Sequence, residues 1–382
     1  MSAERGLSLN RILAVLTKEF IQLTRDKLTY AMILVMPIVQ LLLFGYAINS
    51  DPRDLPTAVL VQDHGPMARS TLSALAHNGY FKIVHEASSP EELDRAIARG
   101  EVQFALTIPA DFTRRVVRGD DAQILVEADA SDPAATGGAI AALANLPRTA
   151  LSRDLVGAVA QTDKDPFEVV IHRRYNPEAI TAYNIVPGLL GVVLSLTLVM
   201  MTSLGMTREY ERGTMESLLA TPAKPIEVMI GKLSPYVVVG LIQTVVILIL
   251  ARVLFSVPMG TGDVGGWCAL ALGVVLFILG SLSLGFLIST VARNQLQAVQ
   301  MSFFYMLPSI LLSGFMFPFR GMPAWAQALG NVIPVTHFLR VVRGSLLKGL
   351  GFEDLWASLL ALAIFVVAIA AAAMSRYRRT LD

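Results

Sequence analysis

Regularly spaced charged side chains are concentrated in the segment 207–223, TREYERGTMESLLATPA. At helical spacing Glu209 lies beside Arg212, and Arg212 beside Glu216, but such pairs stabilise a helix by only about 0.2–0.5 kcal/mol each. A short charged helix with an apolar patch can also seat in a groove of a second protein. From composition alone an ordinary polar loop is the favoured interpretation, and binding to a partner is the alternative. The side chains concerned are Arg208, Glu209, Glu211, Arg212 and Glu216, together with Met215, Leu218, Leu219 and the terminating Pro222.

Residues that could bind a metal or act as catalysts show no comparable pattern. The histidines at 64, 77, 85 and 172 are not paired at helical spacing and have no cysteine neighbours, so a metal site is not expected. The hydrolase, metalloprotease and dinucleotide-binding motifs are absent from the sequence. Gly231-Lys232-Leu233-Ser234 lacks the upstream glycine of a phosphate-binding loop. We therefore expect this chain not to be an enzyme.

Long apolar segments dominate the rest of the sequence. Hydrophobic residues make up 54% and charged residues 16% of the 382 residues, against about 25% charged residues in soluble domains. A bilayer core of about 30 Å requires about 20 apolar residues in a helix. We predict an α-helical polytopic membrane protein with six transmembrane helices, at 29–48, 185–206, 233–255, 267–290, 298–318 and 355–374.

The distribution of lysine and arginine orients these six helices. These residues are more frequent in 1–28, 207–232 and the tail 375–382 than in the loop 256–266 and the segment 319–354. Short cytoplasmic loops carry the excess of positive charge in membrane proteins. We therefore predict that both termini and the segment 207–232 are cytoplasmic.

The polar segment 49–184 replaces the apolar pattern with short β-rich runs that alternate with amphipathic helices. Strands are expected at TAVLVQ, FKIVHE, VQFALTIP, AQILVEAD and FEVVIHRRYN, and one long alanine-rich helix over 133–160. This alternation predicts an inserted α/β domain with its own core. Long loops cross the membrane largely regardless of their charge, so the orientation above makes the domain extracytoplasmic. We interpret it as a docking or gating module, and its lack of a basic stripe with aromatic residues argues against nucleic-acid binding.

Residues 8–27, SLNRILAVLTKEFIQLTRDK, have an amphipathic pattern. Apolar side chains recur at helical spacing on one face, and charged side chains lie on the others. Such a helix lies in the membrane interface. We predict a cytoplasmic interfacial helix within 1–28, with a plain basic anchor as the alternative.

The segment 207–232 resembles the corresponding region of the permease subunits of ABC-2 type transporters. These proteins carry E-R-G-T-x-E-x-L-x-x-T-P, here Glu211 to Pro222, and a G-K pair at the third span, here Gly231 and Lys232. The resemblance covers nearly the whole chain, with one span, a large extracytoplasmic domain and five further spans. It implies a coupling role for Arg208, Glu209, Glu211, Arg212, Gly213, Thr214, Glu216, Leu218, Leu219 and Pro222.

The same resemblance implies partners for this chain. A coupling helix in 207–232 would insert into a separate ATP-binding subunit, present as a dimer, which binds ATP and Mg²⁺ so that this chain holds no cofactor. A second permease subunit, identical or related, would complete the translocation path in the bacterial inner membrane. The subgroup with a large domain after the first span is similar to multidrug efflux permeases, whose outer domains can meet periplasmic adaptor proteins.

The resemblance also includes the outer segment between the fifth and sixth spans, IPVTHFLRVVRG. Pro334, Arg340 and Arg343 belong to it, and His337 stands where an aromatic residue is expected. We predict two short helices within 319–354 that dip into the outer leaflet, with Trp325 at the interface. Their basic side chains either anchor the helices or meet anionic lipid headgroups.

The function favoured by these features is ATP-driven export of hydrophobic or amphiphilic, multidrug-like compounds. A lipid or glycolipid exporter of the same fold is one alternative, and a membrane-anchored receptor or envelope-interaction protein is another. A proton-coupled carrier is disfavoured because the predicted spans contain almost no ionisable residue apart from Arg252. Polar side chains within the spans, such as Gln243, Gln300 and Ser195, are interpreted first as hydrogen-bonding partners between helices.

Overall fold

The computed structural model describes residues 9–25, 53–152, 154, 165–212, 225–260 and 264–376. The chain divides into two compact units, which are described separately below. One unit is helical and is formed by 1–46, 185–316 and 328–382. The other contains a β-sheet and is formed by 47–184 and 317–327.

The sheet unit contains five strands in the order β2-β1-β3-β4-β5. Strands β2, β1 and β3 are mutually parallel, β4 is antiparallel to β3, and β5 is parallel to β4. Each strand overlaps one of the predicted β-rich runs, which supports the interpretation of their periodicity. The strands are β1 (Leu55–Val61), β2 (Phe81–Glu86), β3 (Phe104–Ile108), β4 (Gln123–Asp129) and β5 (Glu168–Arg174).

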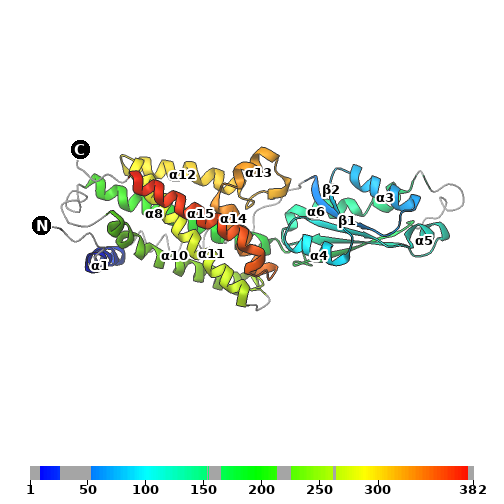
Figure 1. The fold of residues 1–382 in the computed structure, drawn as a ribbon, viewed down its shortest axis with the longest axis horizontal. Coiled ribbons are helices and arrows are strands. Elements are labelled where there is room, and N and C mark those ends of the chain that lie inside the picture. Colours follow the sequence, from blue (N-terminus) through cyan, green and yellow to red (C-terminus); the bar gives the residue numbers. More distant parts are fainter. Residues whose placement is uncertain are drawn as a thin grey trace. The chain divides into compact units, whose positions relative to one another are not determined.

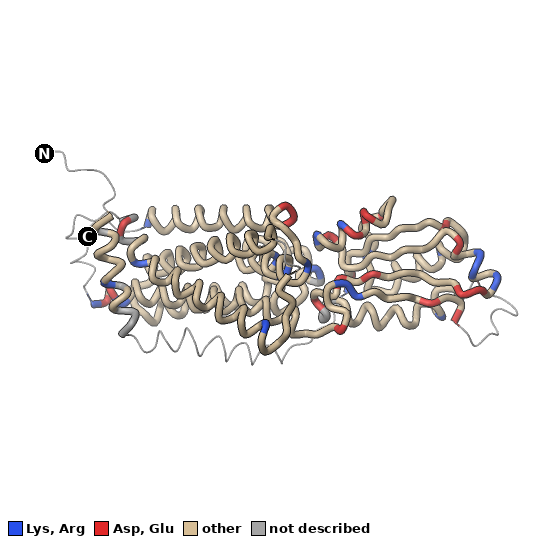
Figure 2. The backbone as a smooth tube through the Cα atoms, turned by 90° about the horizontal axis from the view of Figure 1, so that it is seen from below, with Lys and Arg blue, Asp and Glu red and all other residues tan. Residues whose placement is uncertain are grey.

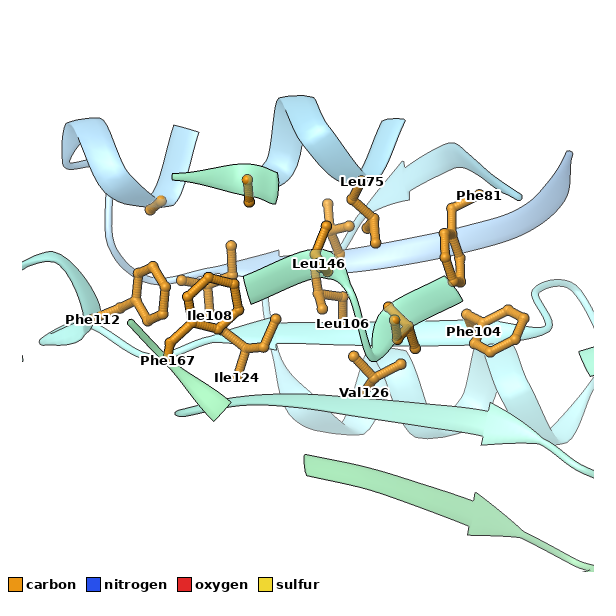
Figure 3. Close-up of a cluster of buried hydrophobic side chains, with 14 of the residues drawn as sticks. Leu75, Phe81, Phe104, Leu106, Ile108, Phe112, Ile124, Val126, Leu146 and Phe167 are labelled. Atoms are coloured by element: carbon orange, nitrogen blue, oxygen red, sulfur yellow. The ribbon is translucent and has the colours of Figure 1, made fainter. Parts of the chain in front are cut away.

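Helices cover both faces of the sheet (Figure 1). The larger core lies under α3, α5, α6 and α7, where Phe81 meets Phe104 edge to face at 4.9 Å and Phe112 meets Phe167 at 5.3 Å (Figure 3). The smaller core lies under α4, around Leu93. The helices are α3 (Pro66–His77), α4 (Pro90–Ala98), α5 (Phe112–Arg118), α6 (Pro133–Leu143) and α7 (Leu146–Ala150), and the sheet unit also includes η2 (Phe319–Gly321) and the start of α13 (Ala324–Gly330).

The single long helix predicted over 133–160 is wrong. The structure has two shorter helices, α6 and α7, which are separated at Ala144 and Asn145. Pro147 lies in the first turn of α7, where its missing N–H would be unsatisfied in any case. In a continuous helix the same proline would remove a hydrogen bond and clash with the preceding turn. Alanine content therefore indicated helix here but did not locate the break.

The helical unit is built from long helices packed side by side (Figure 1). The central helix is α8, and 89% of its apolar window is buried inside the structure. Gly285 of α11 allows close contact with α8, because a Cβ atom at Gly285 would lie 2.7 Å from the carbonyl oxygen of Val199. The helices are α1 (Leu9–Arg25), α8 (Thr181–Glu211), α10 (Pro225–Phe255), α11 (Val264–Val291), α12 (Gln295–Leu312), α14 (Pro334–Leu347) and α15 (Phe352–Arg376).

Four helices among the described residues are long and apolar enough to cross a membrane: α8, α10 from Ile230 onward, α11 and α15. They contain the predicted spans 185–206, 233–255, 267–290 and 355–374. The predicted span 29–48 lies outside the described residues. The predicted span 298–318 is helical only as far as Leu312, in α12, whose first six residues include three glutamines that lower its hydropathy. A total of six spans therefore stays a prediction.

The predicted short helices of the outer segment are present as α13 and α14. Most of α14 is buried, and its Phe338 ring stacks on Phe277 of α11 with the centroids 4.2 Å apart. α14 therefore packs within the helical unit along much of its length.

Candidate coupling site

A buried cluster of charged side chains joins three helices at the end of α8. Glu209, two residues before the end of α8, is only 6% exposed. One of its carboxylate oxygens accepts a hydrogen bond from Lys18 of α1 at 2.8 Å, and the other accepts one from Lys232 of α10. Lys232 is 1% exposed, whereas the Lys18 side chain is about half exposed. The three residues therefore connect α1, α8 and α10 through one carboxylate.

Because these charges are buried, the loss of one of them would be costly for the stability of the protein. A buried ammonium group is tolerated only when a counter-charge and hydrogen bonds replace its lost hydration. Removal of one partner of such a pair costs about 3–5 kcal/mol, because the other charge is then left buried and uncompensated. Glu209 and Lys232 thus hold the end of α8 and the start of α10 together.

Gly231 brings α1 within reach of this cluster. A Cβ atom at Gly231 would lie 2.8 Å from Cγ1 and 2.9 Å from Cβ of Val15, which belongs to α1. Separations below about 3.0 Å do not occur for real Cβ atoms, and a β-branched side chain such as Val15 has little freedom to move aside. The glycine therefore permits α1 to lie against α10, and Lys232, the next residue, binds Glu209. This is a physical reason for the Gly-Lys pair at this position.

A second acidic residue joins α8 to α12. Both oxygens of Glu211 accept hydrogen bonds from Gln295, one from its backbone N–H at 2.7 Å and one from its side-chain amide. Gln295 is the first residue of α12. A carboxylate at the N-terminus of a helix is favoured by the unpaired N–H groups and the positive end of the helix dipole.

Two further contacts continue these connections into the apolar part of the unit. Thr197 of α8 donates to the side-chain oxygen of Gln243 of α10 at 2.9 Å. On its other side, Ser203 of α8 lies 3.1 Å from Ser302 of α12, hydroxyl to hydroxyl. The Thr197–Gln243 pair lies further from the end of α8 than the charged contact between α8 and α10. The Ser203–Ser302 pair likewise lies further from it than the contact between Glu211 and α12. This is the order expected for neighbouring helices that run antiparallel. α8 is therefore hydrogen-bonded to α10 and to α12 at two levels along its length.

In the sequence, Glu209 and Lys232 of the charged cluster lie on either side of the segment 213–224. α8 and its following turn end at Arg212, and α10 begins at Pro225. Of the ten residues expected to take part in coupling, Arg208, Glu209, Glu211 and Arg212 are described. Arg208 donates to the Gln295 side chain at 3.5 Å, and the backbone N–H of exposed Arg212 bonds to the Arg208 carbonyl oxygen at 3.1 Å. Gly213, Thr214, Glu216, Leu218, Leu219 and Pro222 lie outside the described residues.

Glu209 is bound by lysines of other helices in place of its expected neighbour Arg212. Glu209 is buried and binds two lysines from other helices, whereas Arg212 is exposed. Sequence reasoning treated Glu209 as a surface residue and did not predict the involvement of Lys18. The sequence could have identified Lys232 as a candidate for a buried ion pair, because it is a charged residue in the first turns of an otherwise apolar stretch. Glu227, buried in the first turn of α10, was also missed.

The residues of the outer segment 319–354 contact α8 far from the candidate coupling site. Gly188 and Gly191, near the start of α8, pack against Leu339 and Phe338 of α14. About twenty residues of helix separate them from Glu209, which corresponds to roughly 30 Å at 1.5 Å per residue. That length matches the thickness of a bilayer core. Figure 2 shows that charged residues of the helical unit gather toward the ends of its helices, with few in between.

The predicted residues of the outer segment form local contacts. His337 donates from Nε2 to the Asn331 carbonyl oxygen at 2.8 Å, and Arg340 donates to the Asn331 side chain at 2.8 Å. Burial lowers the pKa of His337, the hydrogen bond to Asn331 acts in the opposite direction, and nearby Arg340 lowers it further. Arg343 donates to the Gly314 carbonyl oxygen at 3.0 Å. Pro334 is the buried first residue of α14, and Trp325 on α13 is 65% exposed.

No group of three or more histidine, cysteine or acidic side chains that could hold a metal ion occurs among the described residues.

Comparisons with known proteins agree with the resemblance found in the sequence. The family profile described as ABC-2 family transporter protein matches residues 27–374. The chain is 30% identical over 348 residues to "Probable multidrug ABC transporter permease YbhS" of Escherichia coli, with 90% of each chain covered. It is 26% identical to "Probable multidrug ABC transporter permease YbhR" of the same bacterium, over 97% of this chain and 99% of the other. It is 27% identical to "Inner membrane transport permease YhhJ" of Escherichia coli, over 82% and 84% of the two chains.

Proposed function

The chain belongs to the ABC-2 family of transporter proteins, and from this premise we propose that it is the permease subunit of an exporter driven by a separate ATP-binding subunit. As a member of this family it is a transport component rather than an enzyme. The substrate class that we propose is hydrophobic or amphiphilic, multidrug-like compounds. The names of the relatives from Escherichia coli support this choice.

The observation that carries the proposal is the Lys18–Glu209–Lys232 cluster. A partner subunit that binds the segment 213–224 would act on the end of α8 and the start of α10, which directly flank that segment. Because Glu209 binds lysines of both α1 and α10, a displacement of the segment would reach three helices at once. The contact between Ser203 and Ser302 would extend that displacement to α12.

We propose that six helices cross the inner membrane with both termini in the cytoplasm. The predicted spans 29–48 and 298–318 would add to the four helices that are long and apolar enough. The sheet unit would then lie on the periplasmic side, where it could meet an adaptor protein. A second permease subunit, identical or related, would complete the path, and membrane lipids would surround the apolar faces of α10, α11 and α15 that are exposed in this single chain.

Reconstitution with the ATP-binding subunit tests this function. The permease and that subunit are co-expressed, purified and placed in proteoliposomes, and ATP-dependent transport of a fluorescent amphiphilic cation is measured. The charge-reversal variant Glu211→Arg/Arg212→Glu is expected to reduce co-purification of the ATP-binding subunit and transport together. The matched control is Glu178→Arg/Arg173→Glu, in the sheet unit, which is expected to retain both.

Transport that continues without ATP, or a complex that assembles equally well with the reversed charges, would contradict the proposal. A receptor would instead lose its function on removal of the sheet unit and show no requirement for ATP hydrolysis. Export of a labelled glycolipid without export of the amphiphilic cation would leave the coupling intact but assign a lipid substrate.

A further inference from the structure

The sheet unit contains an open pocket on its surface, formed by residues other than those of the candidate coupling site; it is called the cavity below. Its volume is about 360 Å³, and Asp63, Gly65, Ala110, Thr113, Arg114, Val117 and Arg118 line it. Small-molecule sites in proteins commonly have volumes of about 300–1,000 Å³. The cavity is therefore large enough for a small metabolite.

The position of the cavity in the fold is the one at which α/β sheets bind ligands. The strand order is β2-β1-β3-β4-β5, and β1 and β3 are parallel neighbours. The chain leaves β1 toward β2 on one side and leaves β3 toward β4 on the other side. In open α/β sheets, ligands bind outside the carboxyl ends of parallel strands, and β1 and β3 are parallel although β4 is antiparallel to β3. Asp63 follows β1, and Ala110 and Thr113 follow β3, so the cavity lies at the carboxyl ends of these two strands.

Hydrogen bonds to Asp63 hold the two loops of the cavity together. Its carboxylate accepts the backbone N–H of Gly65 at 2.7 Å, in its own loop, and the backbone N–H of Thr113 at 2.5 Å, in the other loop. Gly65 makes this approach possible, because a Cβ atom there would lie 2.3 Å from Oγ1 of Thr113. Burial alone would raise the pKa of Asp63, but these hydrogen bonds outweigh it and lower the pKa. Asp63 is therefore an anion whose oxygens are occupied by the backbone.

Positive charge exceeds negative charge in the lining. Arg114 and Arg118 are one helical turn apart on α5, and both line the cavity. The nearby carboxylate of Asp111 binds Arg115 at 2.5 Å and lies 3.9 Å from Arg114. Guanidinium groups bind carboxylates and phosphates through paired hydrogen bonds. Two arginines in one concave site therefore favour an anionic ligand.

We propose that this cavity is a binding site for a small molecule with a carboxylate or phosphate group, which Arg114 and Arg118 hold. Asp63 is a positioning residue that fixes the two loops. Val117 and Ala110 supply apolar surface beside the charged group. All of its residues belong to the sheet unit, so they are distinct from the residues of the candidate coupling site.

Binding measurements on the full chain test this proposal. The protein is purified in dodecyl maltoside, whose headgroup carries no charge, and titrated calorimetrically with glycerol 3-phosphate, citrate and, as a neutral control, glycerol. Saturable binding of at least one of the two anions, and none of glycerol, is expected. Arg114→Ala and Arg118→Ala should each raise Kd roughly tenfold or more, since a hydrogen bond to a charged group is lost.

Two further variants separate the site from the general charge of the protein. Val117, which is 58% exposed, can be replaced by tryptophan without disturbing the core, and Val117→Trp should abolish binding by filling the cavity. Arg95→Ala removes an exposed arginine from α4, on the opposite face of the sheet, and should leave Kd unchanged. Competition by vesicles of phosphatidylglycerol would identify a lipid headgroup as the source of the anion, and no competition would identify a soluble ligand. The absence of saturable binding, or the same Kd in all variants, would overturn the proposal.

Discussion

The ammonium group of Lys232 donates a hydrogen bond to the carboxylate of Glu209, 23 residues earlier in the chain, and both side chains are buried. The intervening chain contains the segment 213–224, which carries the proposed coupling residues. The helices on either side of this segment, α8 and α10, are therefore joined by a charge pair. A force that the proposed ATP-binding partner applied to the segment would act on α8 and α10 together.

Removal of the negative charge from this pair should destabilise the protein. Glu209→Gln removes a counter-charge from the buried ammonium group of Lys232, and the free energy of unfolding is expected to fall by about 3–5 kcal/mol. The unfolding temperature in detergent, followed by tryptophan fluorescence, measures it. The double variant Glu209→Gln/Lys232→Met removes both charges and should recover most of the loss. Glu211→Gln, at an exposed carboxylate, is the control and should have a small effect; equal effects at both positions would contradict the assignment.

A side chain at Gly231 should displace α1. Gly231→Val would collide with Val15, so α1 would no longer lie against α10. Tryptic cleavage within α1 should then become faster, and stimulation of the partner's ATPase activity should decrease. Gly137→Ala serves as the control, because open space surrounds Gly137. Unchanged proteolysis of α1 in Gly231→Val would show that the contact does not hold this helix.

A covalent bond between α8 and α12 should block transport. In a Cys268→Ala background, Ser203→Cys/Ser302→Cys places two thiols where two hydroxyl oxygens are 3.1 Å apart. Oxidation should form a disulfide, stop ATP-dependent transport, and leave ATP binding by the partner subunit unchanged. Reduction should restore transport. Ser203→Cys/Ser309→Cys, with the second cysteine about two turns further along α12, should not crosslink. Full transport in the oxidised Ser203→Cys/Ser302→Cys protein would exclude relative motion of α8 and α12 during the cycle.

Protonation of His337 should destabilise the protein at acidic pH. Burial lowers the pKa of His337 in the folded state below its usual value of 6.5. The unfolded state therefore binds more protons near that pH, so stability falls as pH decreases through about 6.5. His337→Gln retains an N–H donor for Asn331 and cannot take up a proton. Its unfolding temperature should depend less on pH between 7.5 and 5.5 than that of the original protein, and parallel pH profiles would contradict the role of His337.

Each of the five predicted β-rich runs overlaps a strand of the sheet unit, and the helix ends there also follow local features. Ser89 accepts a hydrogen bond from the backbone N–H of Glu92 at the start of α4, and Gly119 ends α5 with a φ of 72°. Both signals are contained within a few residues of sequence. The break between α6 and α7 was missed because alanine favours helix on both sides of it, and Pro147 is also compatible with the first turn of a new helix.

The contacts of the coupling site could not be derived in this way. Lys18 and Glu209 are 191 residues apart, and no periodic pattern connects them. Gly231 was identified through the family resemblance, but the reason for a glycine is its contact with a helix at the other end of the sequence. Helical spacing paired Glu209 with Arg212, because spacing describes an isolated helix and ignores the neighbours that bury one of its faces.

The two contacts between α8 and α10 limit how these helices can move. Glu209–Lys232 and Thr197–Gln243 are about 18 Å apart along α8, at twelve residues of helix. A piston-like slide of α8 past α10 by even one residue, about 1.5 Å, would strain both contacts at once. A rigid tilt of the pair preserves both. The two contacts therefore favour a joint tilt of α8 and α10 over a slide of one helix along the other.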